Sequence, residues 1–153
     1  MSRFLRGAIA GAVATAPMSA VMIGAKQFGL IGELPPEKIT ANFLKRTPIS
    51  PSEEHQDSLA TALHFGFGSA AGALFGVIAP KRLIARIPLG MTYGAAIWGV
   101  SYMGWIPAFG IMPHAARDRR DRQMVMLAGH VVYGTALALL VGRRAGNDDE
   151  ERT

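Results

Sequence analysis

Four long stretches of the sequence contain no Asp, Glu, Lys or Arg: residues 7–25, 58–80, 87–116 and 123–142. They hold 19, 23, 30 and 20 residues, and a helix that crosses a bilayer needs about 20. Half of all residues are hydrophobic and only 18% are charged. We therefore expect an all-α integral membrane protein, a four-helix bundle in one domain over residues 1–146, with spans at about 7–26, 57–79, 88–110 and 123–142.

Composition excludes several other classes of protein. The chain has no Cys, so neither a disulfide scaffold nor a Cys-ligated metal site can form. Its net charge is +5, but the basic residues flank apolar runs and do not line one soluble face, which argues against nucleic-acid binding. No Ser–His–Asp set, phosphate-binding loop or HExxH motif is present. We predict no catalytic residues, no metal site and no enzymatic activity; a site before the second span, around His55, Glu53, Glu54 and Asp57, is the open alternative.

The first span has features of a signal peptide, because Arg3 and Arg6 precede it and Ala14-Thr15-Ala16 resembles a cleavage site. However, Pro17 would directly follow the cut, and the apolar run continues to Ala25. We expect a retained helix, kinked at Pro17.

The segments outside the spans also carry predictions. Residues 27–56 form the longest loop, and Pro35-Pro36 opens a short helix over 36–46, either amphipathic at the headgroup level or packed on the bundle. The tail 147–153 contains four acidic residues in a row and is expected to be disordered. Four spans place both termini on one side, and basic residues close to the span ends favour the cytoplasm of a bacterial inner membrane.

Spans two and four match each other at an offset of 66 residues. His64, Gly68, Gly72 and Gly76 align with His130, Gly134, Ala138 and Gly142. Spans one and three match more weakly, through Gly7 and Gly11 against Gly90 and Gly94. The pattern predicts an internal repeat, in which two parallel helix pairs are related by an axis along the membrane normal.

Residues four apart share a face of a helix, so these positions form ridges of small residues, a glycine zipper. The hydrophobic effect does not drive helices together within a bilayer. Small residues promote association instead, because they allow two backbones to approach closely. We expect all twelve aligned residues to form the helix-packing interface. Because no Asp, Glu, Lys or Arg is expected inside a span, the groups usual in proton relays and ion-coupled transport are missing.

His64 and His130 are the ionisable residues placed well inside the predicted spans, and such residues are candidates for function. A neutral His can simply bond a backbone carbonyl, for about 0.6 kcal/mol. Alternatively, the two imidazoles could be axial ligands of a haem, or serve as a proton or pH sensor. Trp98 is expected to pack or to face lipid, and Trp105 suits the aromatic belt at the membrane edge.

The second half resembles a known family in two motifs. Trp105-Ile106-Pro107-Ala108-Phe109-Gly110-Ile111-Met112-Pro113, followed by Gly129-His130-Val131-Val132-Tyr133, is similar to the YagU-like group of small bacterial inner-membrane proteins. The resemblance implies a polytopic inner-membrane protein and transfers no catalytic residue.

Three functions remain open from the sequence. The first is a non-enzymatic scaffold or accessory subunit in the lipid bilayer, assembled as a homo-oligomer or in a larger membrane complex. The second is a haem- or metal-binding membrane protein that uses His64 and His130. The third is a small oligomeric channel or transporter.

Overall fold

The computed structural model describes residues 1–48 and 51–142, and within them the chain is entirely helical apart from its connections. The long helices are α1 (Arg3–Gln27), α3 (Glu53–Ile78), α4 (Leu83–Val100) and α6 (Arg120–Gly142). Together with the segment after α4, they give four candidate membrane spans by length and composition. The prediction of an all-α fold with four candidate spans is confirmed. The predicted tail 147–153 lies outside the described residues.

The third span is longer than α4 alone. After Val100 the chain continues as a π-helical turn, η1 (Ser101–Trp105), and then as the short helix α5 (Ile106–Ala108), so the span runs over Leu83–Ala108. Gly110 ends it with a φ of 67°, a conformation that glycine adopts without strain.

The connecting segments contain two further short helices. Helix α2 (Pro35–Leu44) begins with two prolines, and the Glu37 carboxylate accepts a 2.9 Å hydrogen bond from the backbone N–H of Leu34. The same carboxylate forms a 3.1 Å ion pair with Lys26 at the end of α1. A 3₁₀ turn, η2 (Ala115–Arg117), precedes α6.

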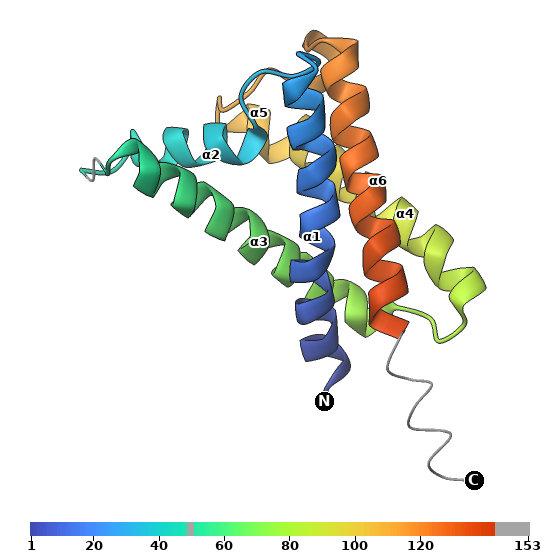
Figure 1. Ribbon diagram of the computed structural model, residues 1–153. Coiled ribbons are helices and arrows are strands. Elements are labelled where there is room, and N and C mark those ends of the chain that lie inside the picture. The colour runs from blue at the N-terminus through green and yellow to red at the C-terminus, as the bar shows by residue number, and fades with distance from the viewer. Residues whose placement is uncertain (49–50, 143–153) are drawn as a thin grey trace, which may run out of the picture.

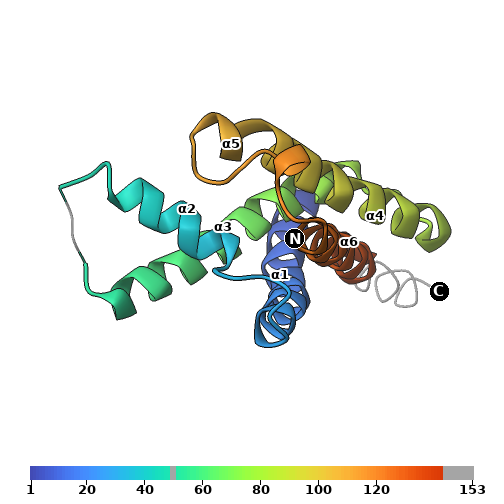
Figure 2. The same ribbon diagram turned by 90° about the horizontal axis from the view of Figure 1, so that it is seen from above.

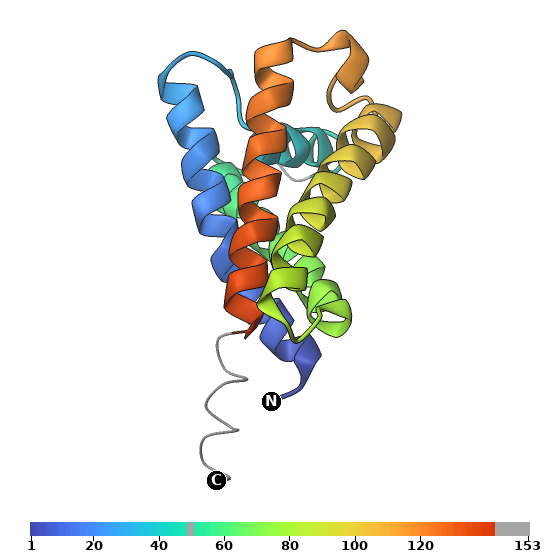
Figure 3. The same ribbon diagram turned by 90° about the vertical axis from the view of Figure 1, so that its right-hand side faces the viewer.

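The four long helices run alternately up and down, so the start of α1 and the end of α6 lie at the same end of the molecule (Figure 1). Helix α1 packs against both α3 and α6, and α6 packs against α4. Figure 3 shows α6 between α1 and α4, which lean apart toward the opposite end. Viewed from above, α3 and α2 extend to one side of this group (Figure 2). The helices therefore converge at the terminal end and diverge at the other.

The buried core is made largely of small and flexible side chains. Helix α1 contributes Ala10, Ala14, Met18 and Met22, all at most 6% exposed. Large apolar residues such as Val13, Leu74 and Val100 are instead more than half exposed. A bilayer would cover such an apolar outer surface, since lipid tails solvate it as well as a protein interior does.

Candidate binding cavity

Glycine contacts hold α1 against α3 at the converging end. A Cβ on Gly11 would overlap the carbonyl oxygen of Gly68 and lie 2.8 Å from the Cα of Gly72. One turn earlier, a Cβ on Gly7 would lie 2.9 Å from the Cα of Gly76. These helices therefore touch backbone to backbone, which a larger residue would prevent. We call this contact the α1–α3 crossing.

A similar contact joins α4 to α6. A Cβ on Gly90 would overlap the carbonyl oxygen of Gly134 and lie 2.7 Å from the Cβ of Ala138. A Cβ on Gly94 would overlap the carbonyl oxygen of His130. We call this contact the α4–α6 crossing. Beyond the two crossings, toward the diverging end, no comparable glycine contact joins the described residues of either pair.

A cavity of about 460 Å³ occupies the space between the diverging helices. Its wall includes Met18 and Met22 from α1, Leu63 and Phe67 from α3, and Met126 from α6. Helix α2 closes the cavity at the diverging end through Pro35, Pro36, Ile39 and Thr40. The cavity has the size and apolar lining of small-molecule sites in proteins.

Two tyrosine hydroxyls fix α3 below the cavity. Tyr133 of α6 donates a hydrogen bond to the carbonyl oxygen of Gly68 (2.6 Å), and Tyr93 of α4 donates to that of Ala71 (2.8 Å). The ring of Tyr93 also packs on Phe75, with 5.2 Å between ring centroids. The converging end of the cavity is therefore closed by bonded, buried groups.

The cavity is open along α3. Leu63 and Phe67 line it, and yet their side chains are 49% and 50% exposed. Both residues belong to α3, which is one of the candidate membrane spans.

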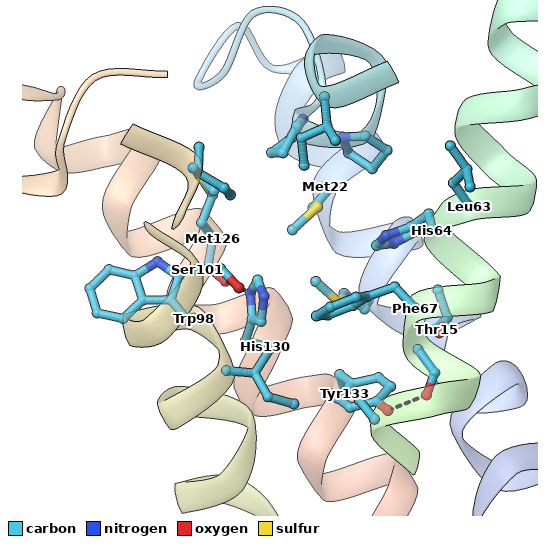
Figure 4. Close-up of a pocket in the computed structure, with 18 of the residues that line it drawn as sticks. Thr15, Met22, Leu63, His64, Phe67, Trp98, Ser101, Met126, His130 and Tyr133 are labelled. Atoms are coloured by element: carbon cyan, nitrogen blue, oxygen red, sulfur yellow. Dashed lines mark hydrogen bonds between the residues drawn. The ribbon is translucent and has the colours of Figure 1, made fainter. Parts of the chain in front are cut away.

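Both predicted histidines line this cavity, His64 from α3 and His130 from α6 (Figure 4). His130 donates from Nδ1 to the carbonyl oxygen of Met126, at 2.7 Å. In a neutral imidazole the other nitrogen, Nε2, is then an acceptor. His64 lies one turn beyond Gly68, the last residue of the α1–α3 crossing, and makes no hydrogen bond to another described residue. The described residues contain no cluster of three His, Asp or Glu side chains that could hold a metal ion.

Two polar atoms at the cavity are buried without a hydrogen-bond partner among the described residues, the Thr40 hydroxyl oxygen and the Trp98 indole nitrogen. Thr40 is 1% exposed. Native proteins bond nearly all such groups, and each exception calls for an explanation. A buried polar group without a partner costs about 1–3 kcal/mol.

The π-helical turn shapes the wall beside Trp98. The backbone N–H of Ile106 bonds the carbonyl of Ser101, five residues earlier, and the Trp105 indole donates to the Ser101 hydroxyl at 3.2 Å. Ser101, Tyr102 and Trp105 all line the cavity. Single π turns inside α-helices are frequent at functional sites.

A polar cluster lies where this wall meets the loop before α6. The fully buried Tyr102 donates a hydrogen bond to the Asp118 carboxylate, which also accepts from the backbone N–H of Arg119 (2.7 Å). Arg122 lies 3.9 Å from the same carboxylate. This cluster ties the loop to the end of the cavity wall.

Arg86 lies inside the candidate span Leu83–Ala108, which begins earlier than the predicted span at 88–110. It lies in the first turn of α4 and is 7% exposed. Its guanidinium donates to the carbonyl oxygens of Ala138 (2.6 Å) and Lys81 (3.0 Å). Arg86 directly precedes the charge-free stretch 87–116, whose 30 residues exceed what one span needs, so the helix could begin earlier than the charge pattern indicated.

The predicted packing residues thus fall into four groups. Gly7, Gly11, Gly68, Gly72 and Gly76 lie in the α1–α3 crossing, and Gly90, Gly94, Gly134 and Ala138 in the α4–α6 crossing. Gly142 instead lies under the guanidinium of Arg86. The two histidines line the cavity, which sequence reasoning did not foresee, nor did it single out Thr40, Arg86, Tyr102 or Asp118.

Comparisons with known proteins leave the function open. No curated protein and no solved structure matches the chain significantly. The profile of one family, described as "Family of unknown function (DUF6789)", matches residues 1–152. The chain, with its four candidate membrane spans, therefore belongs to the DUF6789 family.

Proposed function

We propose that this protein is a non-enzymatic membrane protein that binds a small lipophilic molecule taken sideways from the bilayer. The observation that carries the proposal is the cavity beyond the two crossings, apolar over most of its wall and bordered along α3 by the half-exposed Leu63 and Phe67. Ligand sites of this kind are concave, mostly apolar and equipped with a few polar groups. Here the polar groups are Thr40, Trp98 and the two histidines.

The helix pairs supply a fixed frame for this cavity. We infer that they form two copies of one unit, because aligned positions make similar contacts: Gly7 and Gly11 meet α3, and Gly90 and Gly94 meet α6. Contacts between backbones leave little room for sliding, since packed interiors do not deform continuously. In this proposal the scaffold role is filled within a single chain, by the two helix pairs that hold the cavity open.

Other predictions from the sequence stay proposals. These are a role as accessory subunit, homo-oligomerisation and an oligomeric channel, each of which depends on contacts with a further chain. A bacterial inner-membrane location with cytoplasmic termini and a relationship to the YagU-like group are also proposals. The basic residues near the span ends and the two motifs in the second half support them.

Haem or metal binding is a second candidate function. It is favoured by the two imidazoles that line one cavity, and by the bond from His130 Nδ1 to Met126, because metal-bound histidines commonly donate their other N–H to a carbonyl. Purified protein supplemented with haem should then show a Soret band that His130→Ala removes. No Soret band in the wild-type protein would refute this candidate.

Ligand binding is tested by filling the cavity. Gly66 lines it, and a Cβ on Gly66 would meet nothing within 4 Å, so Gly66→Phe adds a ring without a backbone clash. Gly99 is equally open but does not line the cavity, which makes Gly99→Phe the matched control. The reporter is tryptophan fluorescence, since Trp98 and Trp105 are the two tryptophans of the chain and both line the cavity.

The probe is a long-chain alcohol with a terminal bromine, which quenches tryptophan at short range. In protein reconstituted into lipid nanodiscs, we expect saturable quenching that the unbrominated alcohol reverses. Gly66→Phe should weaken it at least about tenfold, the effect of about 1.4 kcal/mol, and Gly99→Phe should leave it unchanged. Quenching that rises linearly with probe, without competition, would show partition into lipid only and refute the proposal.

A further inference from the structure

We propose that the converging end of the molecule binds an anionic phospholipid, whose headgroup phosphate is held by Arg3, Lys81 and Arg82. This surface is separate from the cavity, so the inference stands independently of the proposed function.

The two ends of the molecule differ in charge. All seven Asp and Glu of the described residues lie at the diverging end, around α2, in the first two turns of α3, and just before or at the start of α6. Eight Lys and Arg accompany them. Every ion pair within the described residues also lies there, for example Lys26–Glu37 at 3.1 Å. Basic charge at the diverging end is therefore largely balanced.

The converging end carries basic residues without acidic ones in the part of the chain that the structure describes. We call them the basic cluster: Arg3, Arg6, Lys81, Arg82 and Arg86. Like charges gathered in this way repel one another, and an anion bound among them relieves the repulsion. The four acidic residues at 148–151 lie outside the described residues, so the experiment below keeps the full chain.

Contacts between α1, α3 and α4 bring the basic cluster together. The Arg3 guanidinium donates to the carbonyl oxygen of Ala79, at the end of α3. Arg86 donates to the carbonyl oxygen of Lys81 at 3.0 Å. Both guanidinium groups thus lie against the connection between α3 and α4, and Figure 3 shows the start of α1 beside this connection.

Lys81 and Arg82 can be reached from outside. Both are exposed, and neither forms an ion pair with another described residue. Arg3 is exposed as well and donates one hydrogen bond to Ala79, which leaves further N–H groups of its guanidinium for a ligand. Phosphate oxygens are strong acceptors for such side chains, because both partners are ionised.

Exposed apolar side chains border the basic cluster. Ile78 precedes the α3–α4 connection and Ile84 follows it, and they are 58% and 85% exposed. Helices α3 and α4 both belong to candidate spans, so their connection lies at the depth of lipid headgroups. A phospholipid can place its phosphate on the charges and its acyl chains on the apolar flanks, whereas a free phosphate can use the charges alone.

The experiment is a lipid titration of the full chain in detergent, followed by native mass spectrometry. The two lipids are phosphatidylglycerol, which is anionic, and phosphatidylcholine with the same acyl chains, which is zwitterionic. We expect phosphatidylglycerol to half-saturate the protein at a concentration at least about tenfold lower. Each basic residue near an anionic headgroup contributes roughly a fivefold gain in affinity.

Paired variants then locate the headgroup. Lys81→Gln/Arg82→Gln removes two charges from the basic cluster and should abolish most of the preference for phosphatidylglycerol. Lys81→Arg/Arg82→Lys keeps both charges and should retain it. Arg117→Gln/Arg120→Gln is the matched control, because these two basic residues are exposed at the diverging end, and it should leave the preference unchanged. The comparison of the two lipids on the wild-type protein needs no variant.

Three results would overturn the proposal. The first is equal binding of the two lipids to the wild-type protein. The second is an equal loss of preference in Lys81→Gln/Arg82→Gln and in Arg117→Gln/Arg120→Gln, which would mean diffuse attraction by the net positive charge. The third is displacement of phosphatidylglycerol by soluble glycerol phosphate, which would show a site for free anions that makes no use of the apolar flanks.

Discussion

Gly11 of α1 lies so close to Gly68 of α3 that even one methyl group on Gly11 would overlap the Gly68 carbonyl oxygen. The two helices meet at this point through their backbones. The cavity begins where this contact ends, because Thr15 is both the next residue against Gly68 and part of the cavity wall. The same contact that joins the helices therefore sets the depth of the site.

Gly11→Ala should destabilise the protein by about 3 kcal/mol, because a buried methyl group there displaces backbone and not a flexible side chain. Gly24→Ala is the control on the same helix, since a Cβ on Gly24 meets nothing within 4 Å. Unfolding in a graded denaturing detergent measures both. Equal stability of the two variants would show that the α1–α3 crossing is not as tight as described.

The second crossing should respond in the same way. Gly94→Ala places a methyl group on the His130 carbonyl and should also cost about 3 kcal/mol. Gly99→Ala, on the same helix and unobstructed, should be nearly neutral. Thermal unfolding in nanodiscs compares them. If Gly94→Ala left the stability unchanged while Gly11→Ala lowered it, the two helix pairs would not be copies of one unit.

Arg86→Gln should lower stability by about 2 kcal/mol, in the range for hydrogen bonds made by charged groups. The buried guanidinium bonds carbonyls near the end of α6 and of the α3–α4 connection, including those of Ala138 and Lys81. Arg82→Gln is the control, because Arg82 is exposed one turn earlier. Chemical denaturation monitored by circular dichroism should show the lower stability of Arg86→Gln and an unchanged stability of Arg82→Gln. If Arg86→Gln were as stable as the wild type, Arg86 would not help to hold the helices together.

Tyr102→Phe should loosen the loop before α6. It removes the hydrogen bond to the Asp118 carboxylate but keeps the buried ring, so we expect a loss of about 2 kcal/mol, in the range for hydrogen bonds to charged groups. Faster amide hydrogen exchange over residues 109–119, with α1 unchanged, would be the signature. Uniform exchange in the variant and the wild type would mean that this cluster does not order the loop.

The spans and the glycine ridges could be predicted from sequence because both depend on local periodicity. Charge-free stretches predict spans, and Gly68, Gly72 and Gly76 at spacing four predict a close contact whatever its partner. The burial of Arg86 was not predicted, because a charged residue directly before a charge-free stretch normally marks the boundary of the span. The buried guanidinium is explained only by its partner Ala138, 52 residues away.

The cavity could not be predicted, because it depends on how far the helices diverge. Thr40 lies on α2 in the long loop and Trp98 lies on the third span, and the two residues line the same cavity only in the folded chain. The π turn at Ser101–Trp105 changes the direction of the following side chains and has no distinct sequence pattern. Trp98 was expected to pack or to face lipid, and its buried, unbonded indole nitrogen became visible only in three dimensions.

The central claim is that the cavity beyond the two crossings receives a small lipophilic molecule from the membrane. The most direct measurement is anomalous diffraction from crystals grown in lipid with the brominated alcohol. We predict a bromine peak inside the cavity, along α3 near Leu63 and Phe67. Bromine peaks confined to the outer surface of the helices, with protein side chains filling the cavity, would contradict the account.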